Sequence, residues 1–152
     1  MTTKSIIIDC LSSPDRLGYN DRGTVLFDDR IVWHDSLRSS PNPYQPSTGK
    51  KWDLVYGWLA PCSTTWECIN SPKHGKCLLL NDGAELPARY PNSNHEGRLV
   101  VSEVEVHCGE TEDWPGSAAC CTVAPSLWPS FIKYFELGDT GQIAIIEKTA
   151  AA

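Results

Sequence analysis

Short apolar runs separated by turn-forming residues set the hydrophobic pattern of this chain. Each run holds a few β-branched, aromatic or leucine residues and is bounded by Gly, Pro, Asn, Asp or Ser, which is typical of strands in a β-rich domain. The strands predicted in this way are Lys4–Asp9, a hairpin within Gly23–Trp33 that turns at Asp28–Asp29, Trp52–Leu59, Thr64–Ile69 and Lys76–Leu80. Ser39–Lys51 and Tyr90–Gly97 are predicted to be irregular polar loops.

The longest predicted strand is Arg98–His107, where apolar and polar residues alternate. This alternation directs Val104 and Val106 to one side of the strand and Glu105 and His107 to the other. The sequence therefore predicts that His107 lies at the end of a rigid element.

The C-terminal part of the chain has a different pattern. Apolar residues at helical spacing within Pro125–Leu137 predict a helix, with Pro129 in its first turn and Gly138 at its end. Thr140–Lys148 is predicted to be a last buried strand. No repeat or linker divides the chain, so we expect one domain over residues 1–152. Its fold class is mostly β, a compact sandwich or barrel with one short helix near the C-terminus.

Charge and hydropathy exclude several classes of partner. The net charge of −6 argues against a nucleic acid bound through its phosphates, which requires a basic surface. No apolar run approaches the ~20 residues of a membrane-spanning helix, and Ile6–Ile8 is too short for a signal-peptide core. We therefore expect synthesis in the cytoplasm, with action at the periplasm or cell wall only after delivery by another route. The oligomeric state is left open.

The seven cysteines are an odd number, so at least one is unpaired within a monomer. Buried reduced thiols and disulfides both remain open, including disulfides of Cys108 or Cys121. A zinc site is the third alternative, because a Cys/His cluster occurs between positions 62 and 77. It comprises Cys62, Cys68, His74 and Cys77. Its spacing lacks the short knuckles of structural zinc sites, so we predict neither a metal nor a cofactor.

The candidate chemistry lies in the stretch from Val104 to Trp128. A nucleophilic cysteine needs a base or an imidazolium beside it, and this stretch holds both His107 and Cys120. Small residues precede the cysteine, so backbone N–H groups can approach a substrate closely and form an oxyanion hole. We predict that Ser117 and Glu105 orient the pair.

The run Ser117–Trp128 (SAACCTVAPSLW) resembles the signature of the L,D-transpeptidase (YkuD-type) catalytic domain, with Ala119 where that family usually has glycine. The likeness is closest to short phage-borne, prophage-borne or effector-like members. Upstream, Ala60–Pro61 and Lys73-His74-Gly75 are similar to the family's turn and strand region, and Gly23–Trp33 is similar to its first hairpin.

The resemblance implies a YkuD-like β-sandwich that acts on the peptide stem of peptidoglycan as a transpeptidase or carboxypeptidase. It implies that Cys120 is the nucleophile, that His107 is the base, and that the acyl group is carried as a thioester. We assign catalysis to Cys120, His107 and Ser117. Ala119, Gly116 and Glu105 are the predicted oxyanion or supporting residues. The predicted cleft residues are Gly109, Trp114, Cys121 and Thr122.

Two departures from the family pattern support an alternative function. Ala119 replaces the usual glycine, and the arginine usual after the cysteine is missing, since Arg98 is the last arginine in the chain. The alternative is a degenerate module of the same fold that binds wall fragments or a phage partner without catalysis. A papain-like hydrolase ranks lower, because such enzymes usually place Cys before His in the chain.

Overall fold

The computed structural model describes residues 2–10, 19, 21–39, 57–112 and 120–147, together with the backbone of 44–45 and 50–51. Within them the structure is mostly β. The strands are β1 Lys4–Cys10, β2 Asp21–Phe27, β3 Arg30–Leu37, β4 Tyr44–Gln45, β5 Lys50–Lys51, β6 Cys62–Ser71, β7 Gly75–Leu80, β8 Leu86–Asn92, β9 Arg98–Val101, β10 Glu105–Cys108, β11 Cys121–Val123 and β12 Thr140–Glu147. The short helices are η1 Asn81–Gly83, η2 Ser93–His95 and α2 Trp128–Ile132.

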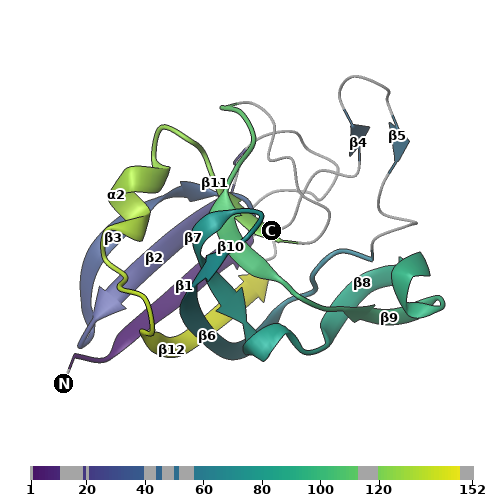
Figure 1. The fold of residues 1–152 in the computed structure, drawn as a ribbon, viewed down its shortest axis with the longest axis horizontal. Helices are drawn as coiled ribbons and strands as arrows, with labels where there is room; N and C mark the ends of the chain where they lie inside the picture. Colours follow the sequence, from purple (N-terminus) through teal and green to yellow (C-terminus); the bar gives the residue numbers. More distant parts are fainter. Residues whose placement is uncertain are drawn as a thin grey trace, which may run out of the picture.

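Eight of these strands form one sheet that curls into a nearly closed barrel (Figure 1). The strand order is β11-β10-β7-β6-β12-β1-β2-β3, with β1–β12 and β10–β11 parallel and the other pairs antiparallel. The two edge strands meet where Arg38, after β3, pairs with Thr122 of β11. Two backbone hydrogen bonds of 2.8 Å join these residues. This bridge brings the two ends of the sheet together at one point, which nearly closes the barrel.

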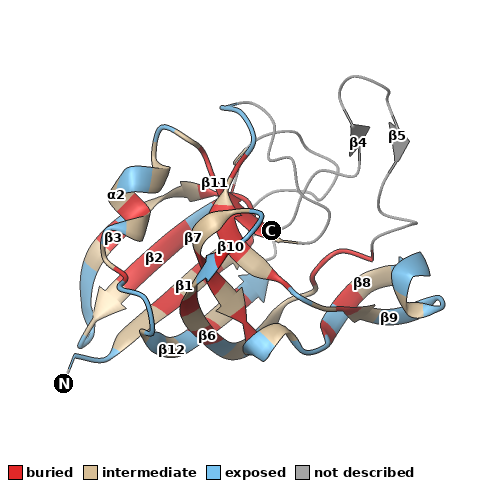
Figure 2. Ribbon diagram, in the orientation of Figure 1, coloured by how far each residue is buried: buried red, intermediate tan, exposed pale blue. Residues whose placement is uncertain are grey.

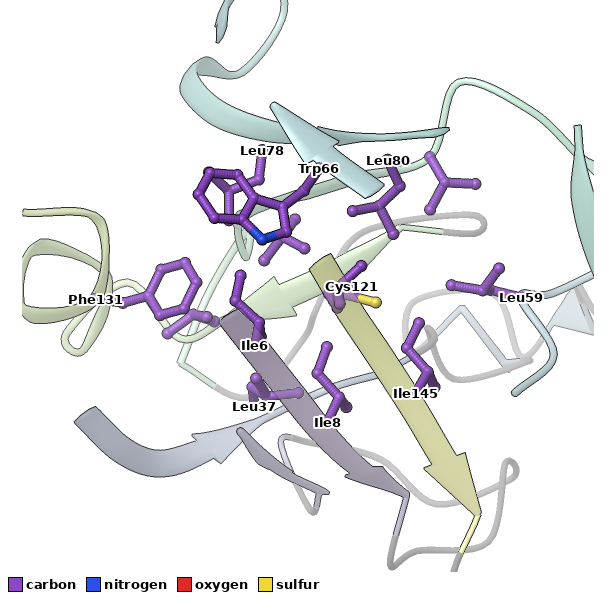
Figure 3. Close-up of a cluster of buried hydrophobic side chains, with 14 of the residues drawn as sticks. Ile6, Ile8, Leu37, Leu59, Trp66, Leu78, Leu80, Cys121, Phe131 and Ile145 are labelled. Carbon is purple, nitrogen blue, oxygen red and sulfur yellow. The ribbon is translucent and has the colours of Figure 1, made fainter. Parts of the chain in front are cut away.

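The barrel interior is filled by aliphatic and aromatic side chains from the inward positions of the strands (Figure 3). Figure 2 shows the buried positions along these strands. Trp66, Ile8 and Leu78 are each almost completely buried in the barrel interior. The helix α2 covers one end of this core, where Phe131 packs edge-on against Trp33 with ring centroids 5.1 Å apart. Burial of these apolar side chains supplies the main stabilisation of the fold.

The predicted strand Arg98–His107 is wrong in its middle, because the chain breaks between β9 and β10. Glu103 lies there with a left-handed backbone, φ 54°, and its N–H donates to the Gly83 carbonyl at 3.0 Å. The break shifts the alternation by one residue, so that Val101 and Val106 both face the core. His107 is therefore the third residue of the four-residue strand β10, which ends at Cys108, and the longest strand is β6.

The second correction concerns Tyr90–Gly97, which was predicted to be a loop. The chain instead continues in β8 as far as Asn92, turns through η2 and returns as β9. β8 and β9 form a separate two-stranded sheet that projects beside the barrel (Figure 1). We refer to β8, η2 and β9 as the arm.

Several local predictions are confirmed. The first strand, the hairpin that turns at Asp28–Asp29, the strand after Ser71–Gly75 and the last strand all occur, the last as β12. The C-terminal helix occurs but is short, with Pro129 in its first turn as expected. It ends at Ile132, so the prediction that Gly138 closes it is wrong. Of the predicted strand Trp52–Leu59, residues 52–56 lie outside the described residues, and Leu59 forms only a bridge with Ala88.

The helices of the described part of the chain are short. None combines the length and the apolar composition that crossing a membrane requires.

Candidate active site

A cleft of about 970 Å³ lies between the outer face of the barrel wall and the arm. The barrel side contributes Ser71, His74 and Glu105, together with Cys120, the residue immediately before β11. The opposite side is formed by η1 and the arm, through Asp82, Gly83, Asn92, Asn94, His95, Val101, Ser102 and Glu103. The cleft is therefore built by long-range contacts between the barrel and the segments from η1 to the β9–β10 break.

Side-chain alternation on β10 and β11 divides these strands into two faces. Val106 and Cys121 are a register pair, are fully buried and face the barrel interior. The residues on either side of each pair member must then face outward. This places Glu105 and His107 on the outer face of β10, and Cys120 and Thr122 at the outward positions around β11.

Cys120 is only partly buried, and its sulfur accepts a hydrogen bond from the backbone N–H of Glu105 at 3.3 Å. A donor directed at the sulfur favours the thiolate over the thiol, and the thiolate is the nucleophilic form. Because the donor belongs to the backbone of β10, the position of the sulfur is tied to the barrel wall.

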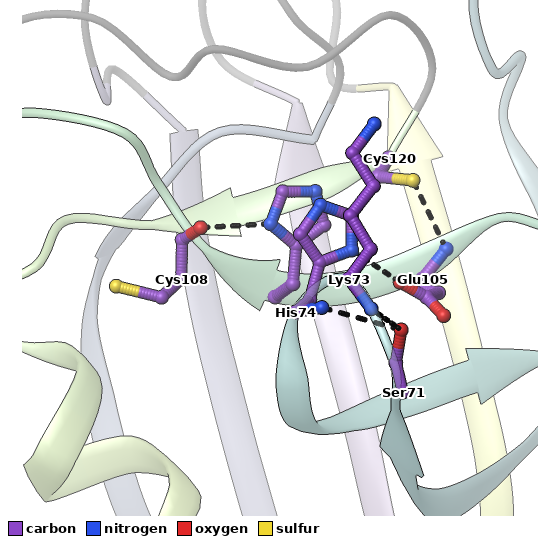
Figure 4. A network of polar contacts seen from close by, with 7 residues as sticks. Ser71, Lys73, His74, Glu105, Cys108 and Cys120 are labelled. Atoms are coloured by element: carbon purple, nitrogen blue, oxygen red, sulfur yellow. Dashed lines mark hydrogen bonds and ion pairs between the residues drawn. The ribbon is translucent and has the colours of Figure 1, made fainter.

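His74 and Glu105 form the second part of the site (Figure 4). His74 lies in the turn between β6 and β7, and its Nδ1 is 2.6 Å from Oε1 of Glu105. The turn is held by Ser71, whose Oγ accepts the backbone N–H groups of Lys73 and His74, both at 3.3 Å. Glu105 thus fixes the ring orientation of His74, and with Nδ1 occupied the proton-transfer position is Nε2.

His107 lies directly against His74. The two imidazole rings are stacked, with centroids 3.7 Å apart and planes 5° from parallel. Nδ1 of His107 is 2.7 Å from the Cys108 carbonyl oxygen, so it carries the proton and donates it. Burial lowers the pKa of His107 to about 4, which keeps the ring neutral at physiological pH.

The structure brings together some of the predicted site residues. Cys120 and Glu105 line the cleft. His107 lies on the outer face of β10, the strand that carries Glu105 and that neighbours β11. His107 and Cys120, the predicted catalytic pair, are not hydrogen-bonded to each other. Nδ1 of His107 is directed to Cys108, and within the described part of the chain its Nε2 has no hydrogen-bond partner.

Other predicted cleft residues lie elsewhere. The prediction for Cys121 is wrong, because this side chain faces the barrel interior, where its sulfur donates to the Ser39 carbonyl at 3.0 Å. Gly109 is buried against the Tyr19 ring rather than in the cleft. Thr122 is fully buried on the outer face. The predictions for Trp114, Gly116, Ser117 and Ala119 fall outside the described residues.

Sequence reasoning missed His74 as a member of this site and considered it as a zinc ligand and as part of the family-like turn Lys73-His74-Gly75. The sequence did show that His74 lies in a short turn between two predicted strands, Thr64–Ile69 and Lys76–Leu80. That pattern places His74 at a strand end. It does not reveal that β7 pairs with β10 and so brings the turn to Glu105.

The seven cysteines are all free thiols in this structure. Burial raises the pKa of six of them, Cys10, Cys62, Cys68, Cys77, Cys108 and Cys121, with that of Cys77 raised to about 12. A raised pKa leaves these six thiols weakly nucleophilic near neutral pH. Across the described ranges, no group of three or more His, Cys, Asp or Glu side chains is arranged to hold a metal ion.

Comparison with known proteins adds no assignment to this geometry. No protein-family model, curated protein or solved structure matches the chain. The chemistry of the site is therefore argued from its own residues.

Proposed function

We propose that the protein is a cysteine-dependent acyl-transfer enzyme in which Cys120 carries the acyl group as a thioester. The observation that carries this proposal is the presence of Cys120 in one cleft with the hydrogen-bonded pair His74 and Glu105. A nucleophile, a nearby base and a third group that orients the base form the common arrangement of covalent catalysis. The YkuD-type fold suggested by the Ser117–Trp128 run is part of the same proposal.

In this mechanism His74 serves as the base of the first half-reaction. Its Nδ1–H donates to Glu105, which leaves the lone pair of Nε2 to accept the proton of Cys120. The sulfur then attacks the substrate carbonyl carbon, the bond to the leaving amine breaks, and the imidazolium of His74 returns the proton to that amine. Glu105 stabilises the imidazolium while it exists.

The proposed substrate is a peptide with a cationic group, such as the amine-bearing peptide stem of peptidoglycan. The cleft is lined by the carboxylates of Asp82, Glu103 and Glu105, whereas Lys73 is its one lysine or arginine among the described residues. This excess of negative charge favours a substrate or acceptor that carries an amine. The family resemblance of the Ser117–Trp128 run points to the same substrate class.

The proposal is tested by incubating the purified protein with muropeptides and separating the products by mass. Cys120→Ala should abolish turnover, and His74→Ala should reduce it on the order of 10²–10⁴-fold, the range typical of a lost general base. Cys62→Ala is the matched control, because Cys62 is a partly exposed thiol that does not line the cleft. Equal activity of the wild type and Cys120→Ala would contradict the mechanism.

The second candidate is a non-catalytic module that binds wall fragments or a phage partner in the same cleft. It is favoured by Ala119 and by the lack of an arginine after Cys120. Saturable binding of muropeptides by both the wild type and Cys120→Ala, without product formation in either, would support this candidate.

A further inference from the structure

Two neighbouring residues on the outer face of the barrel wall each carry a buried polar atom that has no hydrogen-bond partner among the described residues. The two atoms are Nε2 of His107 and Oγ1 of Thr122, in side chains that are 3% and 0% exposed. His107 and Thr122 are a register pair of the parallel strands β10 and β11, so their side chains project to the same side. Buried polar groups in folded proteins are nearly always paired, and one small bound molecule would satisfy both of these atoms.

The hydrogen-bonding capacity of the couple defines the chemistry of that ligand. Nδ1 of His107 donates to the Cys108 carbonyl, so Nε2 presents a lone pair and can only accept. The hydroxyl of Thr122 can donate or accept. A small molecule that donates to Nε2 and accepts from Oγ1 satisfies both atoms, and water or a primary amine meets this requirement.

The couple lies next to Cys120. Cys120 comes two residues before Thr122 and occupies the same outer face, which separates their side chains by about 7 Å along the strand direction. His107 is the diagonal neighbour of Cys120 on β10, since Cys121 is paired with Val106. An acyl group on the Cys120 sulfur can therefore extend toward a molecule held between His107 and Thr122.

We propose that His107 and Thr122 form the binding site of the nucleophile, water or a primary amine, that removes the acyl group from Cys120. This inference rests on the proposed thioester chemistry and assigns the two half-reactions to different histidines. His74 and Glu105, which line the cleft, act in the acylation of Cys120. His107 and Thr122, on the outer face of the barrel wall, act in its deacylation.

With water as the nucleophile, deacylation hydrolyses the thioester on Cys120. The water oxygen bonds to the thioester carbonyl carbon as Nε2 of His107 takes one of its protons. The carbon–sulfur bond then breaks, Cys120 leaves as a thiolate, and His107 returns the proton to the sulfur. The products are a free carboxylic acid and the Cys120 thiol, and an amine in place of water gives an amide.

The test uses p-nitrophenyl acetate, which acylates reactive thiols without requiring knowledge of the natural substrate. In the wild type we expect a burst of p-nitrophenol, an acetyl adduct on Cys120 by intact and peptide mass, and slower steady turnover. Thr122→Val and His107→Gln should keep the burst and slow the loss of the adduct by about tenfold or more. The control is Thr65→Val, at an exposed threonine on β6 outside the cleft, and it should behave like the wild type.

The outcomes separate the two proposals. A wild type that forms no adduct on Cys120 would overturn the thioester chemistry and this inference with it. A normal burst followed by wild-type adduct decay in both variants would overturn the inference alone.

A stability measurement gives a second readout that does not depend on activity. If Oγ1 of Thr122 holds a ligand molecule, Thr122→Val removes a satisfied hydrogen bond and should lower Tm. A hydroxyl that is buried without any partner predicts the reverse, because valine would relieve its desolvation cost. A rise in the Tm of Thr122→Val would therefore contradict the proposed site. This result stands even if His107→Gln does not fold and its kinetics cannot be measured.

Discussion

The two faces of β10 and β11 differ sharply although they are built from neighbouring residues. On the inner face, Val106, Cys121 and Val123 are fully buried and contact the apolar core. On the outer face, Glu105 and His107 hydrogen-bond or stack with polar groups. On these two strands, alternate residues therefore either pack in the core or belong to the candidate active site.

The break at Glu103 explains how the outer face obtains its polar residues. Without the break, the alternation that directs Val101 into the core would also direct Glu105 and His107 into it. The left-handed backbone of Glu103 shifts the phase so that Val104 and Val106 enter the core instead. A non-glycine residue in this conformation costs of the order of 1 kcal/mol, and such strain often occurs at functional sites.

The largest expected effect comes from breaking the inner face. Val106→Asp would place a carboxylate among apolar side chains with no charged partner in the core cluster, and should prevent folding or cost more than about 4 kcal/mol. Val106→Thr, of similar shape, should cost only about 1–3 kcal/mol, because its hydroxyl is neutral. Chemical denaturation followed by circular dichroism measures both. Equal and small costs would contradict the assignment of Val106 to the interior.

The next effect is an acid sensitivity that arises on the outer face. Burial lowers the pKa of His107 to about 4 in the folded protein, whereas an unfolded histidine titrates near 6.5. Between these values the unfolded chain binds more protons, so the free energy of unfolding falls as the pH drops from about 6.5 to about 4. The loss should reach roughly 3 kcal/mol.

His107→Gln tests this acid sensitivity. We expect its stability to depend less on pH than that of the wild type between pH 6.5 and 4, while the difference between the two proteins stays constant above pH 7. Urea denaturation across this range provides the measurement. Parallel curves over the whole range would show that His107 is not held neutral by the fold.

A smaller effect is expected from the charge beside His74. Glu105→Gln keeps a hydrogen-bond acceptor near Nδ1 but removes the carboxylate that stabilises the imidazolium. Acylation of Cys120 should slow by about 10- to 100-fold, with little change in stability. Glu67→Gln, on β6 and outside the cleft, is the charge-matched control. A similar loss in both variants would indicate a general electrostatic effect rather than a specific partner of His74.

Local pattern was sufficient to predict part of the molecule. The strands Lys4–Asp9 and Thr140–Lys148 and the hairpin at Asp28–Asp29 follow from short apolar runs and turn residues, which act within a few positions. Cys120 and Glu105 were found for the same reason, since both lie in one continuous stretch with His107. The short helix followed from helical spacing and Pro129.

The rest depended on contacts that are distant in sequence. The break at Glu103 was not predictable, because glutamate has no preference for a left-handed backbone and the alternation continues through it. His74 reaches Glu105 only through the pairing of β7 with β10. The bridge between Arg38 and Thr122, which brings the sheet edges together, joins segments that no local pattern connects.

The central claim is that Cys120 is an activated nucleophile, and its rate of alkylation tests this most directly. Iodoacetamide should be added near neutral pH, and each of the seven cysteines quantified by peptide mass over time. The account predicts that Cys120 reacts first, faster than the partly exposed Cys62 and Cys108, and that His74→Ala slows it at least about tenfold. Labelling of Cys120 no faster than in the urea-unfolded chain, with no effect of His74→Ala, would contradict the account.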